Sequence, residues 1–524
     1  MAESSGITPS EKLPARQAWI AWLVLLPMLV LSLRACVQFL QWTELAVGFP
    51  YAIDYSEGTI LAQAALLDSG GPHYDALATP PYRASVYPPV YLWTAWGVGR
   101  AWGSLLAGGR LLSALSTLAA AAAASVLVWR LTTDSSAGIS RSLHAGACVA
   151  AGLSVLGSEP IFYWGMLYRP DAMGWALSLA AVVVYPILAA RGRWVWLLLP
   201  LLLLALYTKH SMIAAPLAIG LAWCLRSWKE GLCFCAALGT SGLALIGLGE
   251  WLTGGVFFEN IITGNRNAFF VERIFSMWSE TLVSERWFAL LGLAGALHQG
   301  RLYASAPRDA RSHVRLVALL YFALAWLASA SVGKVGSNPN YFIEALAISI
   351  ALGGTLAADG LLACACKEAG WRTVAGVCAA LLLAWSLGRG DHSLWIASAT
   401  RYKDSQERVH GPMMMKAIRE TEGPVICEDC TYLVLAGRPL EFEPFIMTQL
   451  SLQGAWDQRP FLEELKSGKY ALIALNFELD QDPGFYRERF TEEMLEAMKN
   501  AYAFERRIGA FFLYRPRQAA REKP

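Results

Sequence analysis

The sequence has little charge. Only 16% of its 524 residues are Asp, Glu, Lys or Arg, whereas 55% are apolar and the mean hydropathy is +0.39. A chain this apolar is not an ordinary soluble domain, and its composition predicts a polytopic membrane protein. The 43 basic and 41 acidic residues nearly cancel, so the net charge of +2 gives no reason to expect a nucleic-acid partner.

A disulfide framework and a metal-binding cysteine pattern are also missing. Most of the 10 Cys lie inside apolar runs, where they behave as small hydrophobic residues. Cys427 and Cys430 form the only CxxC in a polar context, and one such pair without a second is weak evidence for a zinc site. This pair is compatible with a disulfide in an oxidising compartment and with two free thiols. Residues 1–17 lack the cleavage site of a signal peptide, so the first apolar run should remain as a transmembrane helix.

Long apolar runs dominate the first three quarters of the chain. At roughly 20 residues per span, they predict an all-α membrane region of about eleven transmembrane helices. The runs lie near 18–40, 109–130, 143–163, 172–190, 193–208, 211–226, 231–250, 286–299, 315–331, 340–358 and 372–388. The stretch from Tyr87 to Gly103 opens with two prolines and contains Arg100, and it is predicted to lie in the membrane interface as an amphipathic helix.

The basic residues then fix the orientation. If the interfacial stretch does not cross, every loop on the amino-terminal side is basic, as the positive-inside rule requires of the cytoplasmic face. These residues are Lys12, Arg16, Arg130, Arg141, Arg191, Arg193, Arg226, Lys229, Arg301, Arg308, Arg311, Arg315, Lys367 and Arg372. The prediction is a multi-pass protein of the cell's inner (plasma) membrane with a cytoplasmic N-terminus and an external C-terminus.

Composition divides the chain into three parts. Residues 1–17 are a cytoplasmic tail, and residues 18–391 are the membrane domain, with a long first external loop at 41–108. Residues 392–524 are more charged and predict a small extracytoplasmic α/β domain, a size that can hold its own core. Its predicted strands are 423–427, 470–475 and 509–514, and its predicted helices are 459–467 and 491–500.

Unusual polar clusters all fall on the predicted external side. Carboxylates suit general-base work on a hydroxyl, and Lys or Arg suits a phosphate. The candidate catalytic residues are therefore Asp54, Glu57 and Asp171, and the candidate phosphate-binding residues are Arg169, Lys209, His210 and Lys334. Two other readings stay open, because Asp54 and Glu57 are also compatible with solvated loop acids, and Arg169 and Asp171 with a mutual ion pair. No partner at ligand spacing makes His210 a metal ligand.

These residues carry a resemblance. The DYxEG form at Asp54, the YPP at Tyr87 and the R-x-D at Arg169 are similar to motifs of the GT-C class of membrane glycosyltransferases. More narrowly, they resemble the bacterial family 39-type branch, which includes protein O-mannosyltransferases and aminoarabinose transferases of lipid A. The likeness covers residues 18 to about 230. Thr208-Lys-His210 resembles a lysine motif of that branch, and Asn338-Pro-Asn340-Tyr341-Phe-Ile-Glu344 resembles a recurrent bacterial element.

The resemblance implies a GT-C fold and an inverting hexosyl- or pentosyltransferase. Such an enzyme moves a sugar from a polyprenyl-phosphate donor to a glycan, lipid or protein acceptor on the outer face of the membrane. Mannosyltransferases of the family typically have adjacent Asp-Glu, whereas here Ser56 precedes Glu57, so the base is either Asp54 or Glu57. Asn340, Tyr341, Glu344 and Tyr87 join the substrate-binding candidates. Cations can meet the charge of the leaving phosphate, so no cofactor and no obligatory divalent ion are expected.

Two other functions remain as alternatives. One is a transporter or flippase of lipid-linked sugars, and the other is a non-catalytic assembly subunit of cell-envelope glycan synthesis. The ionisable residues gather at external helix ends and not at the membrane midplane, and no internal repeat is visible. Both features disfavour a transporter.

Overall fold

The computed structural model describes residues 15–72, 74–132, 138–307, 311–366, 370–481 and 484–517. Residues 1–14 of the predicted cytoplasmic tail lie outside this set. So do three residues of the predicted basic loops, Lys12, Arg308 and Lys367.

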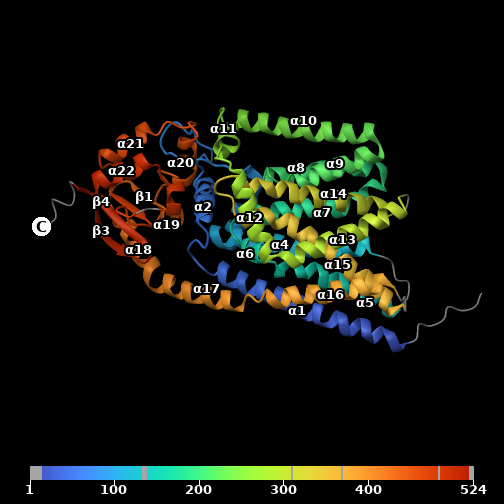
Figure 1. Ribbon diagram of the computed structural model, residues 1–524. Coiled ribbons are helices and arrows are strands. Elements are labelled where there is room, and N and C mark those ends of the chain that lie inside the picture. The colour runs from blue at the N-terminus through green and yellow to red at the C-terminus, as the bar shows by residue number, and fades with distance from the viewer. Residues whose placement is uncertain are drawn as a thin grey trace, which may run out of the picture.

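A bundle of long helices forms the larger part of the molecule (Figure 1). Each predicted apolar run contains a helix, because a backbone in lipid must satisfy its own hydrogen bonds. The helices are α1 (Ala15–Val47), α4 (Leu105–Leu131), α5 (Gly138–Leu153), α7 (Asp171–Ala189), α8 (Leu198–Thr208), α9 (Ala214–Arg226), α10 (Trp228–Leu252), α13 (Arg286–Ser305), α14 (Ser312–Ala328), α15 (Ile343–Ala365) and α16 (Trp371–Arg389). Among the described residues, 7 helical segments are long and apolar enough to cross a membrane. The chain is a multi-pass membrane protein, and its count of eleven spans stays a prediction.

Helix α15 forms the centre of the bundle. It packs against α13, α16 and α5, and its apolar stretch is wholly buried. Small residues allow these helices to approach closely. A Cβ placed on Gly360 would lie 2.3 Å from the Cα of Gly376 on α16, so that crossing tolerates no side chain. By contrast, α10 lies at the edge of the bundle and buries only Gly231 and Phe234 (Figure 1).

Short helices gather at the end of the bundle that carries the C-terminal domain, here called the domain end (Figure 1). Helix α3 covers most of the predicted interfacial stretch, begins with a proline and stops at Gly103, whose φ of 85° suits glycine. The elements are α2 (Tyr55–Asp68), α3 (Pro89–Trp102), η1 (Ser154–Gly157), α6 (Glu159–Trp164), α11 (Phe257–Ile261), η3 (Thr263–Asn265), α12 (Val271–Ser284), η4 (Ser329–Gly333) and η5 (Pro339–Phe342). A further short helix, η2 (Gly192–Leu197), lies between α7 and α8 in a predicted cytoplasmic loop.

The C-terminal part is an α/β domain, as predicted. Its four-stranded sheet has the order β1-β2-β4-β3, with β1 parallel to β2 and the other pairs antiparallel. The predicted strands correspond to β1 (Val425–Cys427), β2 (Leu472–Leu475) and β4 (Phe511–Pro516), whereas β3 (Tyr502–Ile508) was not predicted. The helical elements are α17 (Ser393–Ser405), η6 (Gln406–His410), α18 (Gly411–Arg419), α19 (Cys430–Leu435), α20 (Pro444–Leu452), α21 (Arg459–Lys466), η7 (Gly484–Glu488) and α22 (Glu492–Ala501). Cys427 and Cys430 are buried free thiols.

The first loop is built into this domain. Tyr82 exchanges two backbone hydrogen bonds with the segment around Phe442, at 2.9 and 2.8 Å, and its ring packs among the aromatic residues of the domain core. Helix α2 packs directly against α19. The hydroxyl of Tyr55 at the start of α2 donates to Glu443 of the domain at 3.3 Å. The domain therefore fixes the position of the segment that carries the predicted acids.

Candidate active site

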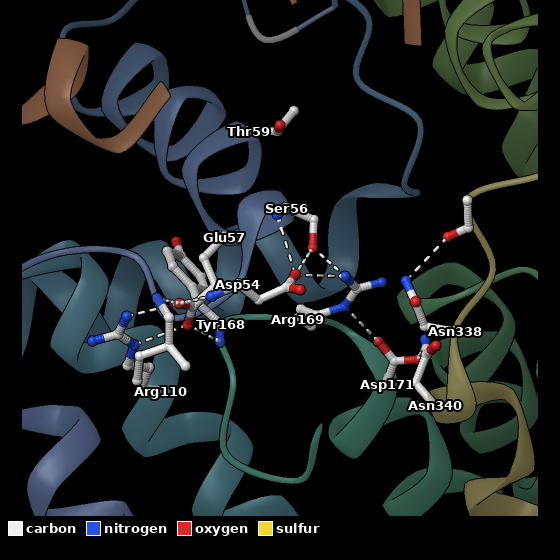
Figure 2. A network of polar contacts seen from close by, with 12 residues as sticks. Asp54, Ser56, Glu57, Thr59, Arg110, Tyr168, Arg169, Asp171, Asn338 and Asn340 are labelled. Carbon is white, nitrogen blue, oxygen red and sulfur yellow. Dashed lines mark hydrogen bonds and ion pairs between the residues drawn. The ribbon is translucent and has the colours of Figure 1, made fainter. Parts of the chain in front are cut away.

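Asp54 caps helix α2. Its carboxylate accepts from the backbone N–H of Ser56 at 3.1 Å, while Glu57 accepts from the backbone N–H of Asp54 at 3.3 Å, which makes a capping box. The Ser56 hydroxyl and an Arg169 guanidinium N–H, the latter at 2.9 Å, also donate to Asp54 (Figure 2). All these bonds go to Oδ1, and none of the described residues donates to Oδ2. The second oxygen is thus left for another partner.

Glu57 lies deeper and is held by Arg110 of α4 (Figure 2). Two guanidinium N–H groups donate to the carboxylate at 2.8 and 2.7 Å, and the backbone N–H of Tyr168 adds a third bond at 2.8 Å. Both side chains are fully buried. Burial raises the pKa of Glu57, but the Arg110 charge and these hydrogen bonds lower it further, to below its ordinary value. Arg110 also donates to the carbonyls of Ala46, Phe49 and Tyr51, so all five of its N–H groups are used.

Asp171 joins two cations. Lys209 donates to it at 2.5 Å and Arg169 at 3.3 Å, and the amide of Asn340 donates at 2.6 Å. Its side chain is 1% exposed, and those of Arg169 and Lys209 are 8% and 4% exposed. The predicted Arg169–Asp171 pair therefore forms, and Figure 2 shows it joined to Asp54 through Arg169. Asp171 extends this chain of ion pairs to Lys209.

Lys334 lies beside this chain and has a neutral partner. Its ammonium donates to the side-chain carbonyl of Asn265 at 3.0 Å, and among the described residues no carboxylate lies within ion-pair distance of it. Burial and the neighbouring Lys209 charge lower the pKa of Lys334 to about 8. Lys209 itself lies over the ring of Tyr341 at 4.5 Å. The phenol of Tyr87 is within electrostatic range of Arg169, Lys209 and Asp171.

Two predicted residues are within electrostatic range of Lys209 but are not hydrogen-bonded to this cluster. His210 follows Lys209 but its side chain is exposed. Glu344 lies in the first turn of α15 and accepts from the hydroxyl of Tyr321 at 2.8 Å. The structure therefore brings together Asp54, Glu57, Asp171, Arg169, Lys209, Lys334, Asn340, Tyr341 and Tyr87, while Glu344 is bound within the helix bundle.

The sequence reasoning missed three residues that shape the site. Arg110 is a lone cation at the end of an apolar run, and that signal was available. Trp164 lies under the guanidinium of Arg169 at 4.9 Å, and Asn265 holds Lys334. Trp164 does not stand out in a sequence that contains 21 Trp, and Asn265 belongs to no motif that predicts a contact with Lys334. Among the described residues, no group of three or more His, Cys, Asp or Glu side chains is placed to hold a metal ion.

Comparison with proteins of known structure identifies the fold. No protein-family model matches the sequence, and no curated protein matches it. Two solved structures of ArnT from Cupriavidus metallidurans are similar to this chain, each at 14% identity. The structure bound to undecaprenyl phosphate matches 95% of this chain and 98% of that chain with a TM-score of 0.54. The apo structure matches 96% and 98% with a TM-score of 0.57. The chain therefore has the fold of the GT-C membrane glycosyltransferases.

Proposed function

We propose that this protein is an inverting glycosyltransferase that moves a sugar from a polyprenyl-phosphate donor to an acceptor on the outer face of the inner membrane. One observation carries the assignment of its base. Of the three clustered carboxylates, Asp54 is 17% exposed, Glu57 is fully buried and Asp171 is 1% exposed. A general base must reach the proton that it removes. Asp54, with its free Oδ2, is the carboxylate that meets this condition.

Glu57 and Asp171 then act as positioning residues. Glu57 ties α2 to α4 through Arg110, and Asp171 holds Arg169 and Lys209 in place. Arg169 in turn orients Asp54 through Oδ1. Each of these side chains has its own partners, so the geometry of the exposed oxygen is fixed before any substrate binds. Such preorganisation is what an active site needs to keep a reacting pair aligned.

The donor phosphate is assigned to the side of Lys334, Lys209 and Tyr341. Lys334 is the cation of this cluster that has no carboxylate partner among the described residues, so it carries a charge that a phosphate can neutralise. The undecaprenyl phosphate bound to the similar ArnT structure supports a carrier of this chemical kind.

The proposed step is a single displacement. Asp54 Oδ2 takes the proton of the acceptor hydroxyl as the oxygen attacks the anomeric carbon. The bond between that carbon and the phosphate oxygen breaks, and its electron pair leaves with polyprenyl phosphate. Attack from the face opposite the leaving group inverts the anomeric configuration. The extra negative charge on the phosphate is met by Lys334 and Lys209. The proposal includes no obligatory divalent ion.

Purified protein incubated with a panel of polyprenyl-phosphate sugars tests this proposal. Release of free polyprenyl phosphate is expected for at least one donor and should persist in EDTA. Movement of the intact donor across a liposome bilayer, with the sugar–phosphate bond unbroken, would instead identify a flippase.

A further inference from the structure

A cavity of about 490 Å³ opens beside the candidate site at the domain end of the bundle. Its walls come from α6, α12 and the start of α17, three elements far apart in the sequence. Its volume is within the roughly 300–1,000 Å³ range of small-molecule sites. The lining residues used below are Glu159, Tyr163, Trp164, Glu280, His392 and Trp395.

One wall of this cavity is also a wall of the candidate site. The ring of Trp164 lies under Arg169 at 4.9 Å, and Tyr163 is within electrostatic range of Asp54. Neither Lys209 nor Lys334 lines the cavity. Trp164 and Tyr163 therefore lie between the cavity and the Asp54–Arg169 pair, and neither that pair nor the two lysines assigned to the donor phosphate lines the cavity.

The lining combines aromatic rings with hydrogen-bond acceptors. Tyr163 and Trp395 meet edge to face, with ring centroids 5.4 Å apart, and Trp395 remains 44% exposed. Glu280 and Glu159 are exposed carboxylates at the cavity, and Nε2 of His392 is a buried atom without a hydrogen-bond partner among the described residues. A sugar ring suits this lining, because its C–H face covers an aromatic ring while its hydroxyls donate to carboxylates. Two carboxylates without a cation in the lining repel a phosphate.

A second cavity of about 280 Å³ continues the first. The two share Glu159, Ser284 and His392, and the second extends to Glu285 and Arg389. Charged and polar groups dominate it, whereas rings dominate the first. Together they offer room beyond the ring that would face Asp54, which suits an acceptor of more than one sugar unit.

We propose that this cavity is the acceptor subsite and that it binds a sugar ring, so that the attacking hydroxyl belongs to a glycan. The inference rests on the proposed transferase function and adds the chemical class of the acceptor. It also assigns opposite sides of the Asp54–Arg169 pair to the two substrates, with the donor phosphate on the lysine side and the acceptor sugar on the aromatic side.

Saturation-transfer NMR on the full-length protein in detergent tests the inference. The probes are methyl glycosides of glucose, mannose, galactose and N-acetylglucosamine at millimolar concentration. At least one should bind the wild type, and Trp395→Ala and Glu280→Gln should each weaken its binding about fivefold to tenfold, the size expected for one aromatic contact or one hydrogen bond to a charged group. Trp385→Ala removes a 58% exposed tryptophan of α16 that does not line the cavity, and it should bind like the wild type.

Three outcomes overturn the inference: no glycoside binds, a glycoside binds all variants equally, or a Ser/Thr peptide binds in a Trp395-dependent manner instead. Release of polyprenyl phosphate from a donor, measured on the same preparations without glycoside, separates the two proposals. Donor turnover with binding that is indifferent to Trp395 rejects only the subsite. Trp395-dependent binding without turnover of any donor rejects the transferase, and with it the acceptor role, and leaves a sugar-binding cavity.

Discussion

At the scale of single residues, the two carboxylate oxygens of Asp54 differ in their hydrogen-bond partners. Oδ1 caps α2 and accepts from Arg169, while Oδ2 has no donor among the described residues. An asparagine keeps an acceptor for the cap and is as good an N-cap as aspartate. It cannot take a proton from a hydroxyl. The structure thus offers a substitution that changes the chemistry and leaves the helix intact.

We therefore expect Asp54→Asn to lower transfer by about 10²- to 10⁴-fold, the usual contribution of a general base, with an unchanged unfolding temperature. Rates of polyprenyl phosphate release and thermal unfolding in detergent provide the measurement. Asp68→Asn is the matched control, because Asp68 lies at the other end of the same helix in an exposed pair with Arg100. Near-normal turnover in the Asp54 variant would move the base to another residue.

Lys334 gives a prediction on pH. Burial and the nearby Lys209 lower its pKa to about 8, so the group is charged below that pH and neutral above it. If the charged form binds the donor phosphate, donor affinity should fall as pH rises from 7 to 9. Lys334→Arg, which stays protonated throughout, should flatten the profile. Titration of donor binding to both proteins checks this, and parallel profiles would exclude Lys334 from the phosphate site.

At the scale of elements, the start of α2 is secured by one arginine. Arg110 binds Glu57 and three carbonyls of the segment before it, and neither charge of the pair is exposed. Removing one partner of such a pair leaves the other buried without compensation. The contribution of Arg110 is therefore expected to appear in stability as well as in rate.

Arg110→Ala should destabilise the protein by about 3–5 kcal/mol, the usual cost of breaking a buried pair, and Glu57→Gln should lower both stability and transfer. Arg110→Lys should fail to rescue, because a lysine lacks the planar fork that reaches five acceptors. Arg100→Ala serves as the control, since Arg100 is 60% exposed and its pair adds little. Chemical denaturation is the measurement, and equal stability of the Arg100 and Arg110 variants would contradict the assignment.

Helices and strands could be predicted from the sequence where one physical signal dominated. The long helices coincide with apolar runs because lipid demands them. Helix α2 was not predicted, since residues 41–108 read as a loop and its apolar residues serve a contact with α19 that no local pattern reveals. Strand β3 was missed because four of its seven residues are exposed and three of those are charged. The segment forms a strand because it pairs with β4.

The candidate site could also be predicted from the sequence only in part. Asp54, Arg169, Asp171 and Lys209 were grouped by sidedness alone, and the structure places them in one chain of ion pairs. Which acid is exposed and which is buried could not be read from the sequence. That distinction depends on Arg110, which lies 53 residues from Glu57 along the chain.

At the scale of the whole molecule, the C-terminal domain packs closely against the membrane bundle at α2. A Cβ on Gly58 would lie 2.8 Å from the backbone nitrogen of Thr431 and 2.9 Å from its hydroxyl oxygen. Backbone cannot yield as a flexible side chain does. One methyl group at this position should therefore push the domain away from α2.

Gly58→Ala is expected to reduce transfer by about tenfold to a hundredfold, the effect of a displacement near 1 Å on aligned groups. Thermal unfolding should also become less cooperative. Gly97→Ala, on the neighbouring α3 with open space around it, should have neither effect. Wild-type behaviour of the Gly58 variant would show that contact with the domain does not position the acid.

The orientation of the whole molecule is tested by single cysteines in a background without the native Cys. A membrane-impermeant maleimide added to intact cells should label Glu422→Cys in the C-terminal domain. It should not label Arg193→Cys, in the predicted cytoplasmic loop before α8. Both positions are exposed in the structure. The reverse pattern would invert the topology and place the candidate site in the cytoplasm.

The contact between the first loop and the C-terminal domain can form only late in the synthesis of the chain. Tyr55 is 388 residues from Glu443, the residue that accepts the hydrogen bond of its hydroxyl. At about 5–20 residues per second, roughly 20 to 80 s separate the appearance of the two on the ribosome. Throughout that interval α2 lacks its partner helix α19, and Asp54 lacks its final setting. A nascent or truncated chain that already spans the membrane would thus be unable to consume donor, and catalysis would begin only once the chain is nearly complete.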